Sequence, residues 1–101
     1  MDDWKYAQKN ASEGLARLHY FTVKKKKGDT EIDVRITVKE IATPDIGALH
    51  FFAMADVPFD PVTKYQPSGW SNTLLGALQE CMLNVRKFDY NGPEAKKETT
   101  G

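Results

Sequence analysis

Apolar and polar residues alternate through residues 32–39, a pattern that predicts a β-strand with one buried face. The apolar positions of this run are Ile32, Val34, Ile36 and Val38. Residues 19–27 are also extended in character, and only Gly28 and Asp29 separate the two runs. Because Gly-Asp suits a two-residue hairpin loop, the two runs predict an antiparallel β-hairpin.

The loop sets the register of this hairpin, because Lys27 then lies opposite Thr30. The pairs expected on the apolar face are Val23–Val34, Phe21–Ile36 and His19–Val38. The pairs expected on the polar face are Lys24–Asp33, Lys26–Glu31, Thr22–Arg35 and Tyr20–Thr37. A slip of one residue would move the apolar side chains of one strand to the opposite face, so the register is tightly specified.

A third strand is expected over residues 48–57, after a turn at residues 43–47 that contains proline and glycine. The residues of this strand expected to face the core are Leu49, Phe51, Ala53, Ala55 and Val57. Residues 58–70 are rich in proline and aromatic side chains. We expect them to form a long loop, which is uncommon unless the loop is functional or packed down by its own side chains.

From residue 71 the apolar spacing becomes helical. The apolar stripe consists of Leu74, Leu78, Cys81, Val85 and Phe88, with Ser71 or Asn72 as the N-cap. A weaker helical stripe at the N-terminus consists of Trp4, Ala7, Ala11, Leu15 and Leu18. Asn10, Ser12 and Gly14 interrupt this second stripe, and each of these residue types weakens a helix.

These elements predict an α+β fold in the order α-β-β-β-α, with a three-stranded antiparallel β-meander. The C-terminal helix is expected to pack on one face of the sheet, and the N-terminal helix is expected to be weak. One domain is expected over residues 1–90. Residues 91–101 are polar and charged without periodicity, so we expect a disordered C-terminal tail.

The charge balance argues against a protein that depends on phosphate contacts. The chain has 14 basic and 14 acidic residues and a formal net charge of zero, whereas nucleic-acid-binding domains usually carry a basic excess. A single cysteine excludes an internal disulfide and is typical of a reducing compartment. No apolar run reaches the ~20 residues of a membrane span, and the acidic N-terminus lacks the layout of a signal peptide. We therefore expect a cytoplasmic protein without a membrane partner.

No pattern of residues marks catalytic, cofactor or metal chemistry. The histidines, His19 and His50, are expected on opposite faces of the sheet, and no cysteine pair accompanies them. Cys81 lies within the apolar stripe of the helix, where a thiol behaves as a small hydrophobe. We expect no cofactor and no metal; a small enzyme with a pocket lined by His50 or by residues 58–70 stays an alternative.

The run Lys24, Lys25, Lys26 and Lys27 concentrates positive charge, which alone would indicate a nucleic acid or a membrane surface. The register places Asp33 and Glu31 opposite two of these lysines, and a charged hairpin end discourages association between sheet edges. A solvated, partly paired hairpin is therefore favoured, with a polyanion-binding site as the alternative.

One face of the sheet is expected to stay free of the C-terminal helix. The residues expected on this open face are Tyr20, Arg35, Thr37, His50, Phe52 and Met54. Such a face is typical of a protein interface, including one between two copies of a chain. It also matches how some RNA-binding modules stack bases. The third interpretation is that the N-terminal segment, led by Trp4 and Tyr6, folds over the face and buries it.

A second surface is expected on the side of the C-terminal helix. Leu75, Met82 and Leu83 project away from the main stripe at 100° per residue, and Arg86 lies beside them. This side patch is either covered by the long loop, with Tyr65 or Trp70 in contact, or it is a contact surface.

Two families share local features with the chain. The run Asn-Thr-Leu-Leu-Gly-Ala-Leu at residues 72–78 is similar to the Gly-Asp-Thr-Leu-x-x-Ala-Leu run that often opens a helix in HicB-like antitoxin domains. Gly76 stands where that family has an acidic residue, and no DNA-binding segment follows, so the resemblance implies a small partner-binding role without an active site. The α-β-β-β-α order resembles the double-stranded RNA-binding fold. That family's lysine cluster is replaced by Ser-Asn-Thr-Leu at residues 71–74, so its functional residues do not carry over.

Taken together, these features favour a small non-catalytic binding module that acts through the open face or the side patch. Its partner would be another protein or a second copy of the chain, as in a homodimer. Binding of single-stranded nucleic acid or RNA by the open face and the lysine run is the alternative.

Overall fold

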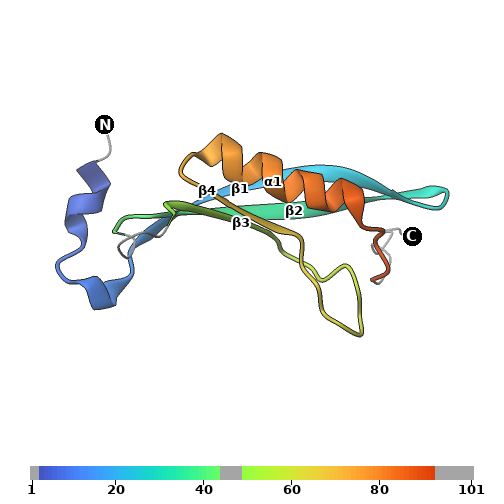
Figure 1. Ribbon diagram of the computed structural model, residues 1–101, viewed down its shortest axis with the longest axis horizontal. Coiled ribbons are helices and arrows are strands. Elements are labelled where there is room, and N and C mark those ends of the chain that lie inside the picture. The colour runs from blue at the N-terminus through green and yellow to red at the C-terminus, as the bar shows by residue number, and fades with distance from the viewer. Residues whose placement is uncertain (1–2, 44–48, 93–101) are drawn as a thin grey trace, which may run out of the picture.

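The computed structural model describes residues 3–43 and 49–92, and shows an open antiparallel sheet with one long helix on one of its faces (Figure 1). The elements are the 3-10 turns η1 (Asp3–Ala7) and η2 (Ala11–Glu13), the strands β1 (Ala16–Lys27), β2 (Thr30–Ile41), β3 (Phe51–Ala55) and β4 (Ser68–Ser71), and the helix α1 (Leu74–Lys87). The four strands follow one another in the order β1-β2-β3-β4. The predicted α+β class, the antiparallel meander and the C-terminal helix are confirmed, and the sheet has four strands where three were expected.

The β1–β2 hairpin has the predicted register. Lys27 pairs with Thr30, and every other expected pair follows from it, down to Tyr20 with Thr37 and His19 with Val38. Gly28 takes a φ of 63°, the left-handed conformation that the two-residue loop requires. The tip of this hairpin extends beyond the end of α1 (Figure 1). The hairpin is longer than expected, because β1 begins at Ala16.

The predicted N-terminal helix is wrong. Its apolar stripe ends in β1, where Leu18 pairs with Lys39, and the residues before β1 form only the two short 3-10 turns. Gly14 takes a φ of 57°, which breaks a right-handed helix at this point. Pairing of β1 with β2 supplies backbone hydrogen bonds that a helix interrupted by polar residues does not match.

The end of the predicted long loop forms β4, which pairs with β3 and was not expected. Apart from Trp70, this four-residue strand consists of glycine and serine, which have little β propensity, so its formation depends on its neighbours. Gly69 permits it, because a Cβ atom there would lie 2.7 Å from the carbonyl oxygen of Ala77 and from the amide nitrogen of Cys81 in α1. The absence of a side chain lets α1 approach the backbone of β4.

The third strand is shorter than the predicted span of residues 48–57. It covers Phe51–Ala55, and residues 44–48 lie outside the described part of the chain. The strand ends at Ala55. The amide of Asp56 still donates to the carbonyl of Arg35, and the chain then enters the loop. Val57 was expected to face the core and is instead exposed. Ala53 and Ala55 do face the core, as predicted.

The core lies between α1 and one face of the sheet. Its buried members are Ile32, Val34, Ile36, Val38, Ala53, Ala55, Phe59, Ala77, Cys81, Val85 and Tyr90. Cys81 is buried as expected, and burial raises the pKa of its thiol to about 11. Thr73, and not Ser71 or Asn72, caps the helix, with its side-chain oxygen accepting from the amide of Gly76 at 2.9 Å. Phe88 was assigned to the buried stripe but lies at the C-cap, where it is exposed.

The loop between β3 and β4 is packed against the domain by its own side chains. This is one of the two explanations expected for a loop of this length, the other being a functional role. Phe59 is fully buried, and its ring meets Tyr90 edge-on at 5.3 Å. Asn91 donates its amide to the carbonyl of Phe59 at 2.7 Å, so the chain after α1 contacts this loop. Residues 93–101, which the sequence assigns to a disordered tail, lie outside the described residues.

Candidate functional site

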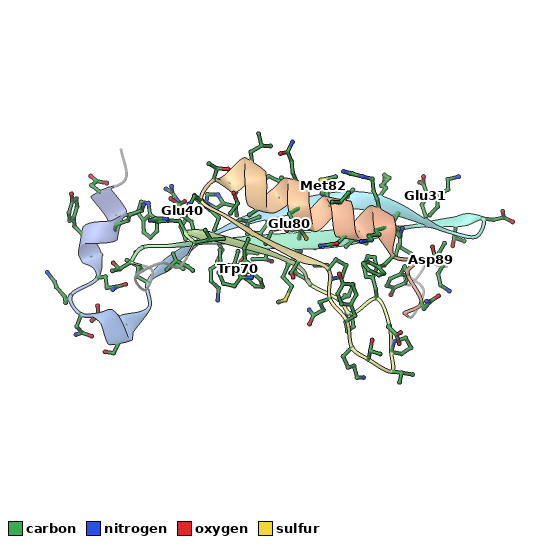
Figure 2. All side chains as sticks on the ribbon, viewed as in Figure 1. Glu31, Glu40, Trp70, Glu80, Met82 and Asp89 are labelled. Carbon is green, nitrogen blue, oxygen red and sulfur yellow. The ribbon has the colours of Figure 1, made fainter. Side chains whose placement is uncertain are left out.

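The face of the sheet opposite α1 is built by strand alternation, since neighbouring residues of a strand point to opposite faces. Two cross-strand rows form its centre: Leu18, Lys39, Phe52 and Trp70 in one row, and Tyr20, Thr37, Met54 and Ser68 in the next. Figure 2 shows Trp70 on the side of the sheet away from α1. The register therefore brings side chains from four strands onto one surface.

Apolar side chains lie on this open face on both sides of β2, and we call this area the aromatic patch. It consists of Leu18 and Tyr20 on β1, and Phe52, Met54 and Trp70 on β3 and β4, with Thr37 and Lys39 of β2 between the two groups. Leu18, Tyr20 and Trp70 are 45%, 59% and 48% exposed, respectively. The rings of Phe52 and Trp70 stack with a tilt of 39° at 4.4 Å between centroids. Large apolar groups from three strands thus stay in contact with water on one face of the sheet.

The charges that border the aromatic patch are largely paired. The Arg35 guanidinium lies 3.8 Å from the Asp56 carboxylate and 5.7 Å from the centre of the Tyr20 ring. Asp56 also accepts a hydrogen bond from the Thr37 hydroxyl at 2.8 Å. Towards the hairpin tip, Lys24 contacts Asp33 at 3.1 Å, and this hydrogen bond raises the pKa of Lys24. Arg35 and Lys24 thus have carboxylate partners on the open face, whereas Lys39 is exposed between Leu18 and Phe52 and no carboxylate of the described residues lies against it.

The structure brings most of the sequence-predicted site residues together. Tyr20, Arg35, Thr37, Phe52 and Met54 share the open face. His50 precedes β3 at the end of that face, where its Nδ1 lies 3.3 Å from the side-chain oxygen of Asn72. Two members of the patch were missed, because Leu18 was assigned to a helix and Trp70 to a loop. The alternation of the hairpin, continued one residue further upstream, would have placed Leu18 correctly; no comparable signal marks Trp70.

The N-terminal residues from Asp3 onwards do not cover the aromatic patch, contrary to one of the three interpretations. The Trp4 ring lies 4.9 Å from the Arg17 guanidinium, and Arg17 has the same strand parity as the core-facing residues of β1. Tyr6 is exposed. In Figure 1 this segment lies beyond the end of the sheet rather than under it.

A buried carboxylate anchors the N-terminal segment at this end of the sheet. Glu40 is 6% exposed and accepts hydrogen bonds from Arg17 at 3.1 and 3.2 Å, with His19 Nε2 2.9 Å from the same oxygen. Lys5 Nζ lies 3.9 Å from the other oxygen. Burial alone would raise the pKa of Glu40, but the hydrogen bonds from His19 and Arg17 outweigh it and hold the pKa below its usual value.

This arrangement predicts how stability changes with pH. Because the pKa of Glu40 is lower in the folded chain than in the unfolded chain, its contribution is present above the unfolded pKa and is lost as the pH falls through the folded pKa. Glu40→Gln is expected to lower the free energy of unfolding at pH 7 by roughly 1–2 kcal/mol. Urea unfolding at pH 7 and pH 3 measures both effects. A variant that loses as much stability at pH 3 as at pH 7 would show that the ionised carboxylate contributes nothing.

The side patch of α1 is not covered by the loop, so the first of its two alternatives does not hold. Tyr65 packs against Phe88 at 5.0 Å, and Trp70 lies on the open face. Leu75 and Leu83 are both exposed.

The side chains of Glu80 and Asn84 show which flank of α1 faces β4. The Glu80 carboxylate accepts from the amide of Trp70, and the Asn84 amide donates to the carbonyl of Ser68, each at 2.8 Å. Met82, half-buried, projects from the opposite flank of the helix (Figure 2). The side patch is therefore on the β1 side of the helix, with Arg86 exposed at its end.

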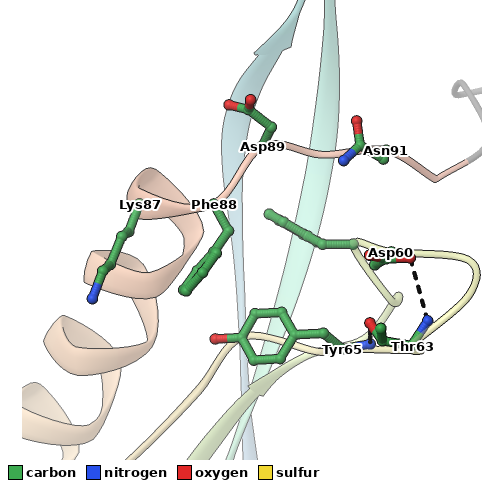
Figure 3. A pocket seen from close by; sticks show the side chains of 8 residues that line it. Asp60, Thr63, Tyr65, Lys87, Phe88, Asp89 and Asn91 are labelled. Carbon is green, nitrogen blue, oxygen red and sulfur yellow. Dashed lines mark hydrogen bonds between the residues drawn. The ribbon is translucent and has the colours of Figure 1, made fainter.

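A hollow of about 500 Å³ lies between the β3–β4 loop and the end of α1 (Figure 3). Its lining residues are Phe59, Asp60, Thr63, Tyr65, Lys87, Phe88, Asp89 and Asn91. The Asp60 carboxylate accepts from the amides of Val62 and Thr63, and these bonds lower its pKa. Burial raises the pKa of Tyr65. Both shifts move the pKa values of these two groups further from neutral pH.

Metal-ligating side chains are not grouped in the described ranges: residues 3–43 and 49–92 contain no cluster of three or more His, Cys, Asp or Glu able to hold a metal ion. Within the same ranges, no helix is long and apolar enough to cross a membrane. Comparison with protein-family models, with curated proteins and with solved structures finds no match.

Proposed function

We propose that this protein is a non-catalytic binding module that binds a protein partner through the aromatic patch. The observation that carries the proposal is that Leu18, Tyr20 and Trp70 are exposed on the same face of the sheet as Phe52 and Met54. Exposed apolar groups that form one patch, rather than standing singly, are typical of interaction sites. Aromatic residues and methionine are also enriched at protein interfaces.

The charges support a protein partner over a nucleic acid. Arg35 and Lys24 already have carboxylate partners on the same face, Asp56 and Asp33. The chain as a whole carries no net charge. Affinity for a phosphate backbone comes mainly from cations that are free to neutralise it, and the pairing of Arg35 and Lys24 leaves Lys39 and Lys26 for that role on the open face.

Site-specific photo-cross-linking in the native cell tests the proposal. A benzoylphenylalanine at position 70 replaces one aromatic group with another inside the patch, whereas the same group at Asp29, exposed in the hairpin turn and outside both candidate surfaces, is the matched control. We expect a protein adduct from position 70 and none from position 29. Phe52→Asp is expected to weaken binding by about thirtyfold or more, because it places a charge at the centre of the interface. Equal adducts at both positions would contradict the proposal.

Binding of single-stranded nucleic acid is the second candidate. Tyr20, Phe52 and Trp70 place three aromatic rings on an open sheet face, as base-stacking modules do, and the lysine run lies further along β1. A random single-stranded oligonucleotide at low salt is then expected to quench Trp70 fluorescence, with an affinity that falls steeply as salt is added. If no quenching occurs at low salt, this candidate is removed.

A further inference from the structure

The outer edge of β1 is the longest unpaired stretch of backbone in the sheet. β1 is the first strand in the order β1-β2-β3-β4 and is 12 residues long, whereas β4 at the other edge has 4. An unpaired edge presents a row of N–H and C=O groups to which another strand can bind. In the described residues, no segment of the chain pairs with this edge.

The hydrogen-bonding pattern shows which groups point outwards. Ala42 donates its amide to the carbonyl of Leu15 at 3.0 Å, and the two-residue turn closes on Lys27 and Thr30. In an antiparallel pair, hydrogen-bonded residues alternate with residues whose backbone groups face away. The odd-numbered residues of β1 therefore bond to β2, and the even-numbered ones, such as Thr22, present N–H and C=O at the free edge.

Only one half of this edge is protected against strand pairing. Residues 24–27 are all lysine, and lysine at an edge discourages association. Residues 16–23 contain neither lysine nor proline. In this half, Leu18 and Tyr20 are exposed on the open face, and Phe21 and Val23 are only partly buried on the other, since α1 packs over β2, β3 and β4. This half thus has apolar side chains on both faces, and its charged residue Arg17, like His19, is bonded to Glu40.

We propose that the unprotected half of β1 binds a second copy of this chain, β1 to β1 and antiparallel, about a two-fold axis at Tyr20. In this register Leu18 lies opposite Thr22 of the second copy, and Arg17 lies opposite its Val23. Moving the axis to Phe21 would set Arg17 against Lys25 of the second copy, and like charges directly opposite are destabilising. We call the paired stretch of the two β1 strands the seam. The axis at Tyr20 gives the longest seam without such a like-charge pair, and the lysine run of each copy extends beyond it.

A second copy fits this edge because the outward N–H and C=O groups of residues 18, 20 and 22 meet the same groups of the second copy about a two-fold axis, which makes the edge complementary to itself. The two sheets would become one continuous sheet with both helices on the same side. The two aromatic patches would then adjoin at Tyr20 and form a single larger surface. The inference does not depend on the partner-binding role, because the backbone of the edge forms the seam, although Leu18 and Tyr20 also belong to the aromatic patch.

Proline at Thr22 tests the seam. Its amide points outwards, so Thr22→Pro removes a donor of the seam and no hydrogen bond to β2. By sedimentation equilibrium we expect the wild type to form a dimer of 11.4 kDa chains. Thr22→Pro is expected to weaken the dimer about ten- to hundredfold, because symmetry removes the bond twice. Thr22→Val keeps the amide and is expected to stay dimeric. A wild type that is monomeric throughout, or a Thr22→Pro variant that dimerises normally, overturns the proposal.

Disulfide trapping gives a second readout if Thr22→Pro does not fold. The axis brings position 20 of both copies directly opposite at about 5.5 Å between Cα atoms, within reach of a disulfide. Tyr20→Cys is expected to form a covalent dimer under mild oxidation, and Lys26→Cys, beyond the seam, is expected to stay monomeric. Cys81 is buried in both variants. Absence of the covalent dimer at position 20, or equal trapping at position 26, contradicts the register.

Discussion

Ile36→Ala is expected to lower the free energy of unfolding by about 2–5 kcal/mol, the largest effect of any substitution suggested by this fold. Ile36 is fully buried in the middle of β2, between Phe21 on β1 and Ala55 on β3, and faces α1. Truncation removes apolar contacts and leaves a cavity that the flanking strands, held by their hydrogen bonds, can fill only in part. Because a domain of this size has a total stability of roughly 5–15 kcal/mol, the variant is expected to be close to unfolding.

Two further variants separate burial from strand pairing. Ile36→Val removes one methylene and is expected to cost about 0.5–1.5 kcal/mol. Lys39→Ala changes an exposed residue of the same strand on the open face and is expected to change stability by less than about 0.5 kcal/mol. Urea unfolding followed by circular dichroism measures all three. Equal losses for Ile36→Ala and Lys39→Ala would contradict a sheet with one buried face.

Gly69→Ala is expected to destabilise the fold by about 1–3 kcal/mol although it adds a single methyl group. The new Cβ atom would lie 2.7 Å from backbone atoms of Ala77 and Cys81, and also 2.7 Å from the Glu80 Cβ. Backbone atoms of a helix do not yield as a flexible side chain does, so α1 must move away from β4. That movement would strain the bonds of Glu80 and Asn84 to β4.

The matched control for Gly69→Ala is Ser68→Ala, which changes the neighbouring residue on the open face. Thermal unfolding of the two variants is expected to show a lower midpoint for Gly69→Ala and one near that of the wild type for Ser68→Ala. A Gly69→Ala variant as stable as the wild type would show that α1 does not approach β4 as closely as described.

The β1–β2 hairpin was predictable because its information is local. Alternation sets the face of each residue, and the Gly28-Asp29 turn sets the register, so every expected cross-strand pair was correct. The same local rules correctly predicted that Tyr20, Arg35 and Thr37 lie on the open face. The core-facing side of β3 was an assumption, because both faces of this strand are apolar in the sequence; the burial of Ala53 and Ala55 confirms it.

The strand β4 and the N-terminal segment were not predictable in the same way. β4 exists because Gly69 admits the helix and because Glu80 and Asn84 bond to its backbone, and these contacts come from residues far along the chain. Trp70 therefore could not be placed on the open face from the sequence. At the N-terminus, a helical spacing of apolar residues competed with pairing of β1 to β2, and the pairing prevailed.

The proposed binding surface exists only if the chain leaves its own open face uncovered, and the accessibility of Trp70 tests this most directly. In a Trp4→Phe variant, Trp70 is the single tryptophan, and acrylamide quenching of its fluorescence measures its exposure to solvent. We expect efficient quenching, comparable to that of an exposed indole, at concentrations where sedimentation defines the oligomeric state. Strong protection of Trp70 in a monomer would show that this chain buries the aromatic patch itself, and would contradict the proposed function.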